Sequence, residues 1–232
     1  MRYLFIAVLF FCIYSCHQQA DNKPINAVSP ELNFSSNKSY LEIKDSIVIN
    51  RKKLFSKYPS LKRETREITD FWVNNISNEL YNKWQNTPWD FNGTAVNPGK
   101  GTIACGYFVT TILRDMDCKI NRNRLAVCAS SVMMKTLTPQ QKIKNLSYLS
   151  YTAFNDTLTQ LGKGVYIIGL DFHTGFIVND GKENWFIHSN YIKRKGVTKE
   201  PVYNSPALRA SKTRWLISLT GDMHFVAGWL KG

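Results

Sequence analysis

Residues 172–190 read FHTGFIVNDGKENWFIHSN, and this stretch decides the fold class of the chain. It contains two short runs rich in Val, Ile and Phe on either side of Asp180-Gly181, a dipeptide that favours a hairpin turn. The pattern predicts two antiparallel β-strands. A similar run, GVYIIGL (164–170), precedes them, and RWLISL (214–219) follows a basic loop at 193–212. The sequence therefore predicts an antiparallel meander.

Helical spacing of apolar residues dominates the chain before this sheet. It predicts a long helix at 62–85 and another at 105–116. Further helices are predicted at 46–57 and 122–135, with two short ones near 138–139 and 153–161. Helices first and an antiparallel sheet second are typical of an α+β fold.

Composition and charge limit the kind of protein. The chain has 232 residues, of which 44% are hydrophobic and 13% aromatic, which suits one globular domain with a hydrophobic core. A disordered or fibrous protein is excluded by this mixture. The formal net charge of +13 indicates anionic partners, such as cell-wall glycopeptide, acidic lipid headgroups or nucleic acid.

The N-terminus carries an apolar run that predicts export. Residues 4–14 follow Arg2, are too few to span a bilayer, and lead into Ser15-Cys16 and a polar segment. This arrangement resembles a bacterial lipoprotein signal, which implies cleavage before Cys16 and its lipidation. The alternative is an ordinary secretory signal. We expect a signal peptide at 1–15, a flexible tether at 16–39 and one domain at 40–232. The expected location is the bacterial cell envelope, as a periplasmic or outer-membrane lipoprotein.

Three residues could form a nucleophilic site. Cys105 opens a predicted helix, where free backbone N–H groups and the helix dipole favour a thiolate. His173 and His188 lie on consecutive predicted strands and can face the same side of the sheet, within hydrogen-bonding range. One imidazole would then accept the thiol proton and the second would orient it. Taken singly, a helical cysteine or a strand histidine is more often a structural residue.

Two segments resemble the signature of the NlpC/P60 cysteine peptidases, which are papain-like cell-wall hydrolases. WDFNGTAVNPGKGTIACGYFV (89–109) matches the loop and helix start around the family's nucleophile, and FHTGFIVNDGKENWFIHSN matches its histidine block. The resemblance implies an α+β domain of the papain-like NlpC/P60 type, with N-terminal helices packed on an antiparallel sheet. It also implies Cys105 as nucleophile, His173 as base and His188 as the orienting residue.

The flanks of the nucleophile depart from that family. Relatives usually carry Asp and Ser on either side of the cysteine, where they help to bind the free amine of a stem peptide. This chain has Ala104 and Gly106 instead. The resemblance therefore implies hydrolysis of a peptide or amide bond, with an amidase activity as consistent as an endopeptidase one.

Several other polar and aromatic residues each allow two interpretations. Trp89 and Asp90 could line the entrance of the cleft, although a core position is common for tryptophan. Asp171 could bind a substrate amine or be a solvated carboxylate at a strand end. His224 is expected to be structural. Cys118 and Cys128 could form a local disulfide or remain buried thiols.

The sequence predicts no cofactor and no metal, although a zinc site made of the two histidines and Cys105 is conceivable. We expect a monomeric cysteine peptidase or amidase, anchored to the membrane by its N-terminal lipid, that cleaves peptidoglycan or another envelope substrate. The basic run KRKGVTK (193–199) is expected to be a solvated loop or a contact with anionic envelope polymers, not a nucleic-acid site. The alternative is a non-catalytic, lipid-anchored binding module on the same scaffold.

Overall fold

The computed structural model of this protein describes residues 37–60 and 65–232. All of them fall in the unit that begins at Phe34. The predicted signal peptide, Cys16 and the tether up to residue 36 lie outside the described residues. Within the described ranges, no helix is both long enough and apolar enough to cross a membrane.

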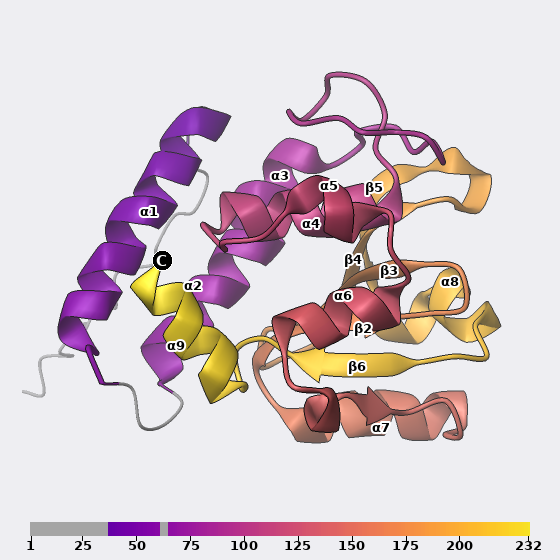
Figure 1. Cartoon of the computed structure of the whole chain (residues 1–232). Helices are drawn as coiled ribbons and strands as arrows, with labels where there is room; N and C mark the ends of the chain where they lie inside the picture. Colours follow the sequence, from indigo (N-terminus) through magenta and orange to yellow (C-terminus); the bar gives the residue numbers. More distant parts are fainter. Residues whose placement is uncertain (1–36, 61–64) are drawn as a thin grey trace, which may run out of the picture. The chain divides into compact units, whose positions relative to one another are not determined.

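Six strands of the described residues form one antiparallel sheet in the order β1-β6-β2-β3-β4-β5 (Figure 1). They are β1 (Lys144–Asn145), β2 (Gly164–Gly169), β3 (Thr174–Asn179), β4 (Asn184–Asn190), β5 (Gly196–Pro201) and β6 (Trp215–Ser218). The sheet and the helices packed on it confirm the predicted α+β class.

The strand order corrects the simple meander predicted from the sequence. Strands β2 to β5 follow one another, but β6 returns to pair with β2 on its other side. Strand β5 lies inside the segment predicted as a basic loop, and it pairs with β4 over six residue pairs. It was not predicted because Lys199 and Glu200 are residue types depleted in strands.

The helices of the described residues agree with most of the predicted ones. They are α1 (Tyr40–Lys57), α2 (Arg66–Asn74), α3 (Tyr81–Trp84), α4 (Cys105–Asp115), α5 (Arg122–Ala126), α6 (Ser130–Leu137), α7 (Tyr151–Leu161), α8 (Pro206–Ala210) and α9 (Met223–Lys231). A π-helix, η1 (Asn75–Leu80), joins α2 to α3, and short 3₁₀ turns are η2 (Gln140–Lys142), η3 (Ile192–Arg194) and η4 (Val202–Asn204).

Two helix boundaries differ from the prediction for local reasons. Helix α1 begins at Tyr40 rather than at residue 46 because Ser39 and Glu42 form a capping box, each accepting from the other's backbone N–H. The predicted helix at 122–135 is in fact two helices. Ala129, between α5 and α6, has a non-helical backbone with φ −57° and ψ 144°, so the helix is interrupted before α6 begins.

Apolar side chains cover both faces of the sheet. Phe176 and Ile187 face one cluster, which takes in residues of α1, α2, α4, α6 and α9. Ile177 and Phe186 face a second cluster with α7 and α8. The alternation follows the pleat of the strands. Helix α4, which carries Cys105, therefore lies on the first face and contacts β3 and β4.

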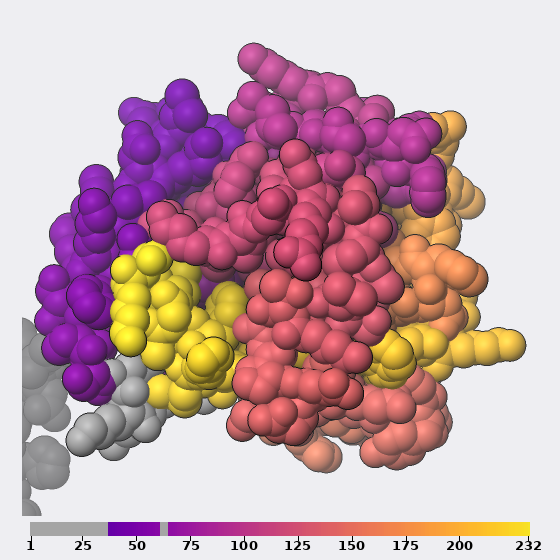
Figure 2. Space-filling view, viewed as in Figure 1, coloured from indigo at the N-terminus to yellow at the C-terminus, as the bar shows by residue number. Residues whose placement is uncertain are grey.

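A cavity of about 420 Å³ lies between α9 and the segment of α5 and α6. Figure 2 shows α9 in yellow beside this rose-coloured segment. Cys118, Leu137 and Trp229 line the cavity, together with His224. His224 lies on α9 and is exposed. Its backbone N–H donates to the carboxylate of Asp222, the N-cap residue of α9.

Gly106 allows α5 to pack against the start of α4. A Cβ atom on this residue would lie 2.1 Å from the carbonyl oxygen of Ala126. That distance is far shorter than any van der Waals contact, so a larger residue must displace the α5 backbone. A serine at this position has no room in this chain unless α5 moves.

We expect Gly106→Ala to lower the free energy of unfolding by about 1–3 kcal/mol, because overpacking displaces neighbouring backbone. Urea denaturation of the purified chain measures this change. Gly228→Ala is the matched control, since a Cβ there meets nothing within 4 Å and lies in α9. The control should gain up to about 1 kcal/mol from helix propensity. Equal stability of Gly106→Ala and the wild type would contradict the packing argument.

Candidate functional site

Cys105 is the first residue of α4, and Ala104 is its extended N-cap residue. A buried hydrogen bond fixes this helix start: the hydroxyl of Ser189 donates to the carbonyl oxygen of Ile103 at 2.6 Å. Because Ser189 follows His188 on β4, the bond joins the helix start to the strand that carries a predicted site histidine. Residues far apart in the sequence are thereby held in one place.

The two strand histidines form a hydrogen-bonded pair. Nε2 of His173 lies 2.7 Å from Nδ1 of His188, and both side chains are buried. The rings thus meet as strand alternation predicts. Gly175 makes room for them, since a Cβ there would lie 2.6 Å from the Phe186 ring and 2.8 Å from the His188 Cβ. The His188 ring stacks on Phe186 with centroids 3.9 Å apart.

The sulfur of Cys105 lies close to the backbone at the start of β3, where the chain leaves His173. Backbone N–H groups of Thr174, Gly106 and Cys105 itself face it, and Thr174 directly follows His173 in the chain. Burial nevertheless outweighs these donors and raises the pKa of the Cys105 thiol. Burial and the nearby His188 hold the pKa of His173 well below 6.5. At neutral pH the unliganded site therefore contains a thiol and a neutral imidazole, not the thiolate expected from the helix dipole.

Glu200 on β5 extends the pair, and sequence reasoning missed it. Its Oε1 atom lies 3.4 Å from Nε2 of His188. This is ion-pair distance without hydrogen-bond alignment, and neither atom has another partner among the described residues. Burial opposes ionisation of Glu200, but His188 and Ser205 together lower the pKa of its carboxyl group. The only usable signal in the sequence was the alternation of side chains within GVTKEP (196–201), but the charged residues of this segment are more typical of a loop.

Trp89 and Asp90 lie on the loop before α4 and approach the histidines through Tyr191. The Trp89 ring centroid is 6.4 Å from that of Tyr191, which in turn is 5.0 Å from the ring of His173. Asp90 accepts from Arg194 at 2.5 Å. Trp89 is half-buried rather than part of the core. The structure thus brings both residues to the side of the site that Tyr191 covers.

Asp171 has a local structural partner. Its carboxylate accepts from the backbone N–H groups of Lys212 and Thr213, each at 2.8 Å. Bonds from Thr213 and Lys212 lower the pKa of Asp171. These contacts fix the loop that leads into β6. They favour a structural role for Asp171 over binding of a substrate amine.

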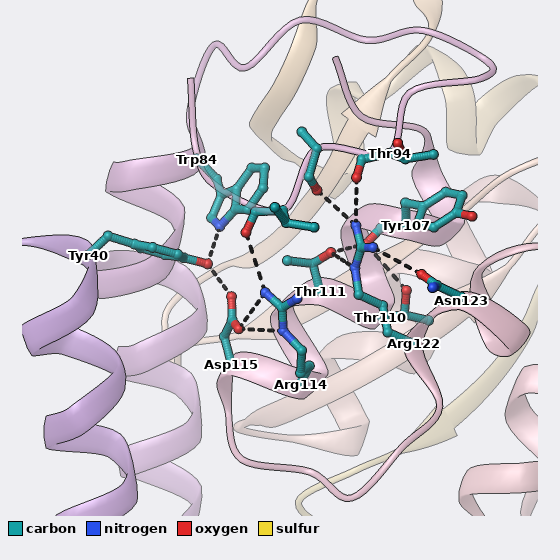
Figure 3. Close-up of polar contacts among 12 residues, drawn as sticks. Tyr40, Trp84, Thr94, Tyr107, Thr110, Thr111, Arg114, Asp115, Arg122 and Asn123 are labelled. Carbon is teal, nitrogen blue, oxygen red and sulfur yellow. Dashed lines mark hydrogen bonds and ion pairs between the residues drawn. The ribbon is translucent and has the colours of Figure 1, made fainter. Parts of the chain in front are cut away.

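Arg122 holds the loop that precedes Cys105 (Figure 3). Its guanidinium group donates to the carbonyl oxygens of Thr94 and Ala95 at 3.1 and 2.8 Å, and to the hydroxyl of Thr111 on α4 at 2.7 Å. It also lies over the ring of Tyr107, 4.7 Å from the centroid. Because these carbonyls belong to the turn-rich loop, Arg122 fixes that loop against α4, which begins at Cys105.

A second polar network anchors the far end of α4. The buried carboxylate of Asp115 accepts from the hydroxyl of Tyr40 and pairs with Arg114 at 2.8 Å. The indole N–H of Trp84 donates to the same Tyr40 oxygen at 2.7 Å. Figure 3 shows this chain running from α1 through α3 to α4. Both ends of the helix that presents Cys105 are thus fixed.

Cysteine pairing and metal ligation were also open from the sequence. Cys105, Cys118 and Cys128 are all free thiols, so the local disulfide between Cys118 and Cys128 is not formed in this structure. In residues 37–60 and 65–232, no group of three or more His, Cys, Asp or Glu side chains is arranged to hold a metal ion.

The buried histidine pair should make stability depend on pH. The unfolded chain takes up protons at the ordinary histidine pKa near 6.5, whereas His173 and His188 have lowered pKa values when folded. The free energy of unfolding should therefore fall as the pH drops below about 7, by up to about 1.4 kcal/mol per pH unit for each histidine. Urea titrations between pH 7.5 and 5 measure the slope.

The variant His173→Asn should flatten this slope, while His224→Gln, at an exposed position, should leave it unchanged. An unchanged slope in His173→Asn would contradict the neutral, buried state of the pair.

The Cys105 thiol should alkylate slowly near pH 7. Its pKa is raised by burial, so the rate should keep rising above the free-thiol pKa of about 8.5. Time courses with iodoacetamide, read by mass spectrometry of the Cys105 peptide, measure this, and Cys128 in the same chain is the internal reference. A Cys105 rate that reaches its plateau below pH 7 would contradict the raised pKa.

No family model matches this chain, and neither a curated protein nor a solved structure matches it. The likeness to NlpC/P60 peptidases therefore rests on the motifs around Cys105, His173 and His188. Membership of that family stays a prediction.

Proposed function

We propose that this protein is a thiol hydrolase of peptide or amide bonds, with Cys105 as nucleophile, His173 as base and His188 as the orienting residue. The observation that carries the proposal is the 2.7 Å bond between Nε2 of His173 and Nδ1 of His188, with the backbone N–H of the next residue, Thr174, facing the Cys105 sulfur. That bond engages one nitrogen of His173 and leaves Nδ1 as the nitrogen that can serve the thiol. A nucleophile, a base and an orienter in this order are the parts of a Cys-His-X triad.

The neutral resting site determines how the reaction would start. Nδ1 of His173 accepts the thiol proton as the sulfur attacks the carbonyl carbon, so the thiolate forms only when substrate is present. The tetrahedral oxyanion would be stabilised by backbone N–H groups at the start of α4, including that of Cys105. The imidazolium then protonates the leaving amine. Water, deprotonated by His173, hydrolyses the thioester and releases the acid.

Peptidoglycan is the proposed substrate, and the lipid-anchored cell envelope is the proposed location. The net charge of +13 suits an anionic wall polymer. The sequence of elements, with a nucleophile helix followed by histidine-bearing antiparallel strands, supports a papain-like arrangement of the NlpC/P60 type. The Ala126 carbonyl lies so close to Gly106 that it excludes the serine found at this position in the NlpC/P60 family. This favours an amide substrate that is bound without a contact to such a serine.

The direct test is release of soluble fragments from purified sacculi and from synthetic stem peptides and muramyl amides. Cys105→Ala should reduce turnover by at least about 10³-fold, because the covalent step is lost. Cys128→Ser is the matched control, since this half-buried thiol on the α5–α6 connection should leave activity unchanged. Equal turnover by Cys105→Ala and the wild type, or no turnover by either on all these substrates, would exclude the proposed hydrolase.

A non-catalytic binding module is the second candidate, favoured by two observations. His173 is only 5% exposed and the Cys105 thiol pKa is raised, as expected for a site that is not poised for attack. On this alternative, wild type and Cys105→Ala would bind sacculi equally in a pull-down and release no fragments. The hydrolase instead predicts that Cys105→Ala binds while only the wild type releases product.

A further inference from the structure

The histidine pair continues to a third ionisable side chain across the next strand. Phe186 on β4 pairs with Glu200 on β5, and His188 pairs with Thr198, so Glu200 and His188 are diagonal neighbours on one face. Lys199 points to the opposite face, where its ammonium lies over the ring of Trp185. Strand alternation thereby separates the two charges and directs the Glu200 carboxylate alone toward His188.

The contact between Glu200 and His188 is unusual because it is buried and incomplete. The Glu200 side chain is 13% exposed, and its Oε1 atom and the facing Nε2 atom of His188 have no other partner in the described part of the chain. Burying an ionised carboxylate without a full set of hydrogen bonds is unfavourable. Ser205 also supports this carboxylate and lowers its pKa, so the oxygen left without a hydrogen-bond partner, Oε1, is the one that faces the imidazole.

The carboxylate fixes where the protons lie on both rings. An ionised carboxylate only accepts, so its charge 3.4 Å from Nε2 favours the proton of a neutral His188 on that nitrogen and leaves Nδ1 bare. The bare Nδ1 of His188 then accepts from Nε2 of His173 across the 2.7 Å bond. Since the first ring is also neutral, its own Nδ1 must be bare. In the proposed hydrolase, this nitrogen would receive the proton of Cys105.

We infer that Glu200 is a positioning residue that sets the tautomers of His188 and His173 and so keeps the base ready to accept the thiol proton. This inference deepens the proposed hydrolase and rests on it for the meaning of the bare Nδ1. Its structural content, two imidazoles each protonated at Nε2, is independent of any substrate. Lys195 is the other charged group that acts on both His188 and Glu200, and it is exposed.

The first test is the tautomer of each ring in the full chain labelled with ¹⁵N-histidine, because protonated and bare ring nitrogens have well-separated NMR shifts. The wild type should show Nε2-protonated rings for His173 and His188 at pH 7.5. Glu200→Met, which removes the acceptor, should give mixed tautomers on both rings. Glu200→Gln retains an acceptor oxygen and should largely restore the wild-type pattern. Glu183→Gln, an exposed carboxamide control on the β3–β4 hairpin, should change nothing.

Wild-type tautomers in Glu200→Met would overturn the inference, provided that a urea titration shows the variant to be folded. So would a wild-type chain in which either ring is protonated at Nδ1.

The second test is turnover on whichever substrate the wild type cleaves. Glu200→Met should lower kcat at least tenfold with little change in KM, whereas Glu200→Gln should recover part of kcat. Full kcat in Glu200→Met would overturn the positioning role. If the wild type cleaves nothing, the proposed hydrolase fails, and the NMR experiment still decides separately whether Glu200 sets the tautomers.

Discussion

The hydrogen bond from the Ser189 hydroxyl to the Ile103 carbonyl is the constraint on which the site depends. It is buried and joins the loop before α4 to the strand that carries His188. Without it, the start of α4 and the end of β4 would be held together only by packing. With it, the position of the Cys105 sulfur is coupled to the register of β3 and β4, which also sets the distance between the two imidazoles.

Burial and helix electrostatics act on Cys105 in opposite directions. The helix start and the Thr174 N–H favour the thiolate, yet desolvation of the sulfur is the larger effect. The same desolvation keeps both histidines neutral. A site of this kind stores no charge at rest. In the proposed hydrolase, charge would separate only when a substrate carbonyl is in place to share it, which would limit side reactions of the cysteine.

Much of this arrangement could be predicted from the sequence because its signals are local. The hairpin at Asp180-Gly181 placed two strands, and their alternation placed His173 against His188. Strand β5 could not be predicted, because its residues follow tertiary contacts rather than a strand pattern. Lys199 donates to the carbonyl oxygen of Ser77 in η1, and the Glu200 carboxylate faces His188. The direction of the Cys105 pKa shift was also beyond the sequence, since it depends on how deeply the folded chain buries the sulfur.

The contact between Gly106 and the Ala126 carbonyl has a consequence for how such a site can diversify. A side chain at position 106 and the present position of α5 are mutually exclusive. The residue after Cys105 is thus epistatic to the path of a neighbouring helix. In the proposed hydrolase, substrate specificity at this position would change only together with the backbone of α5.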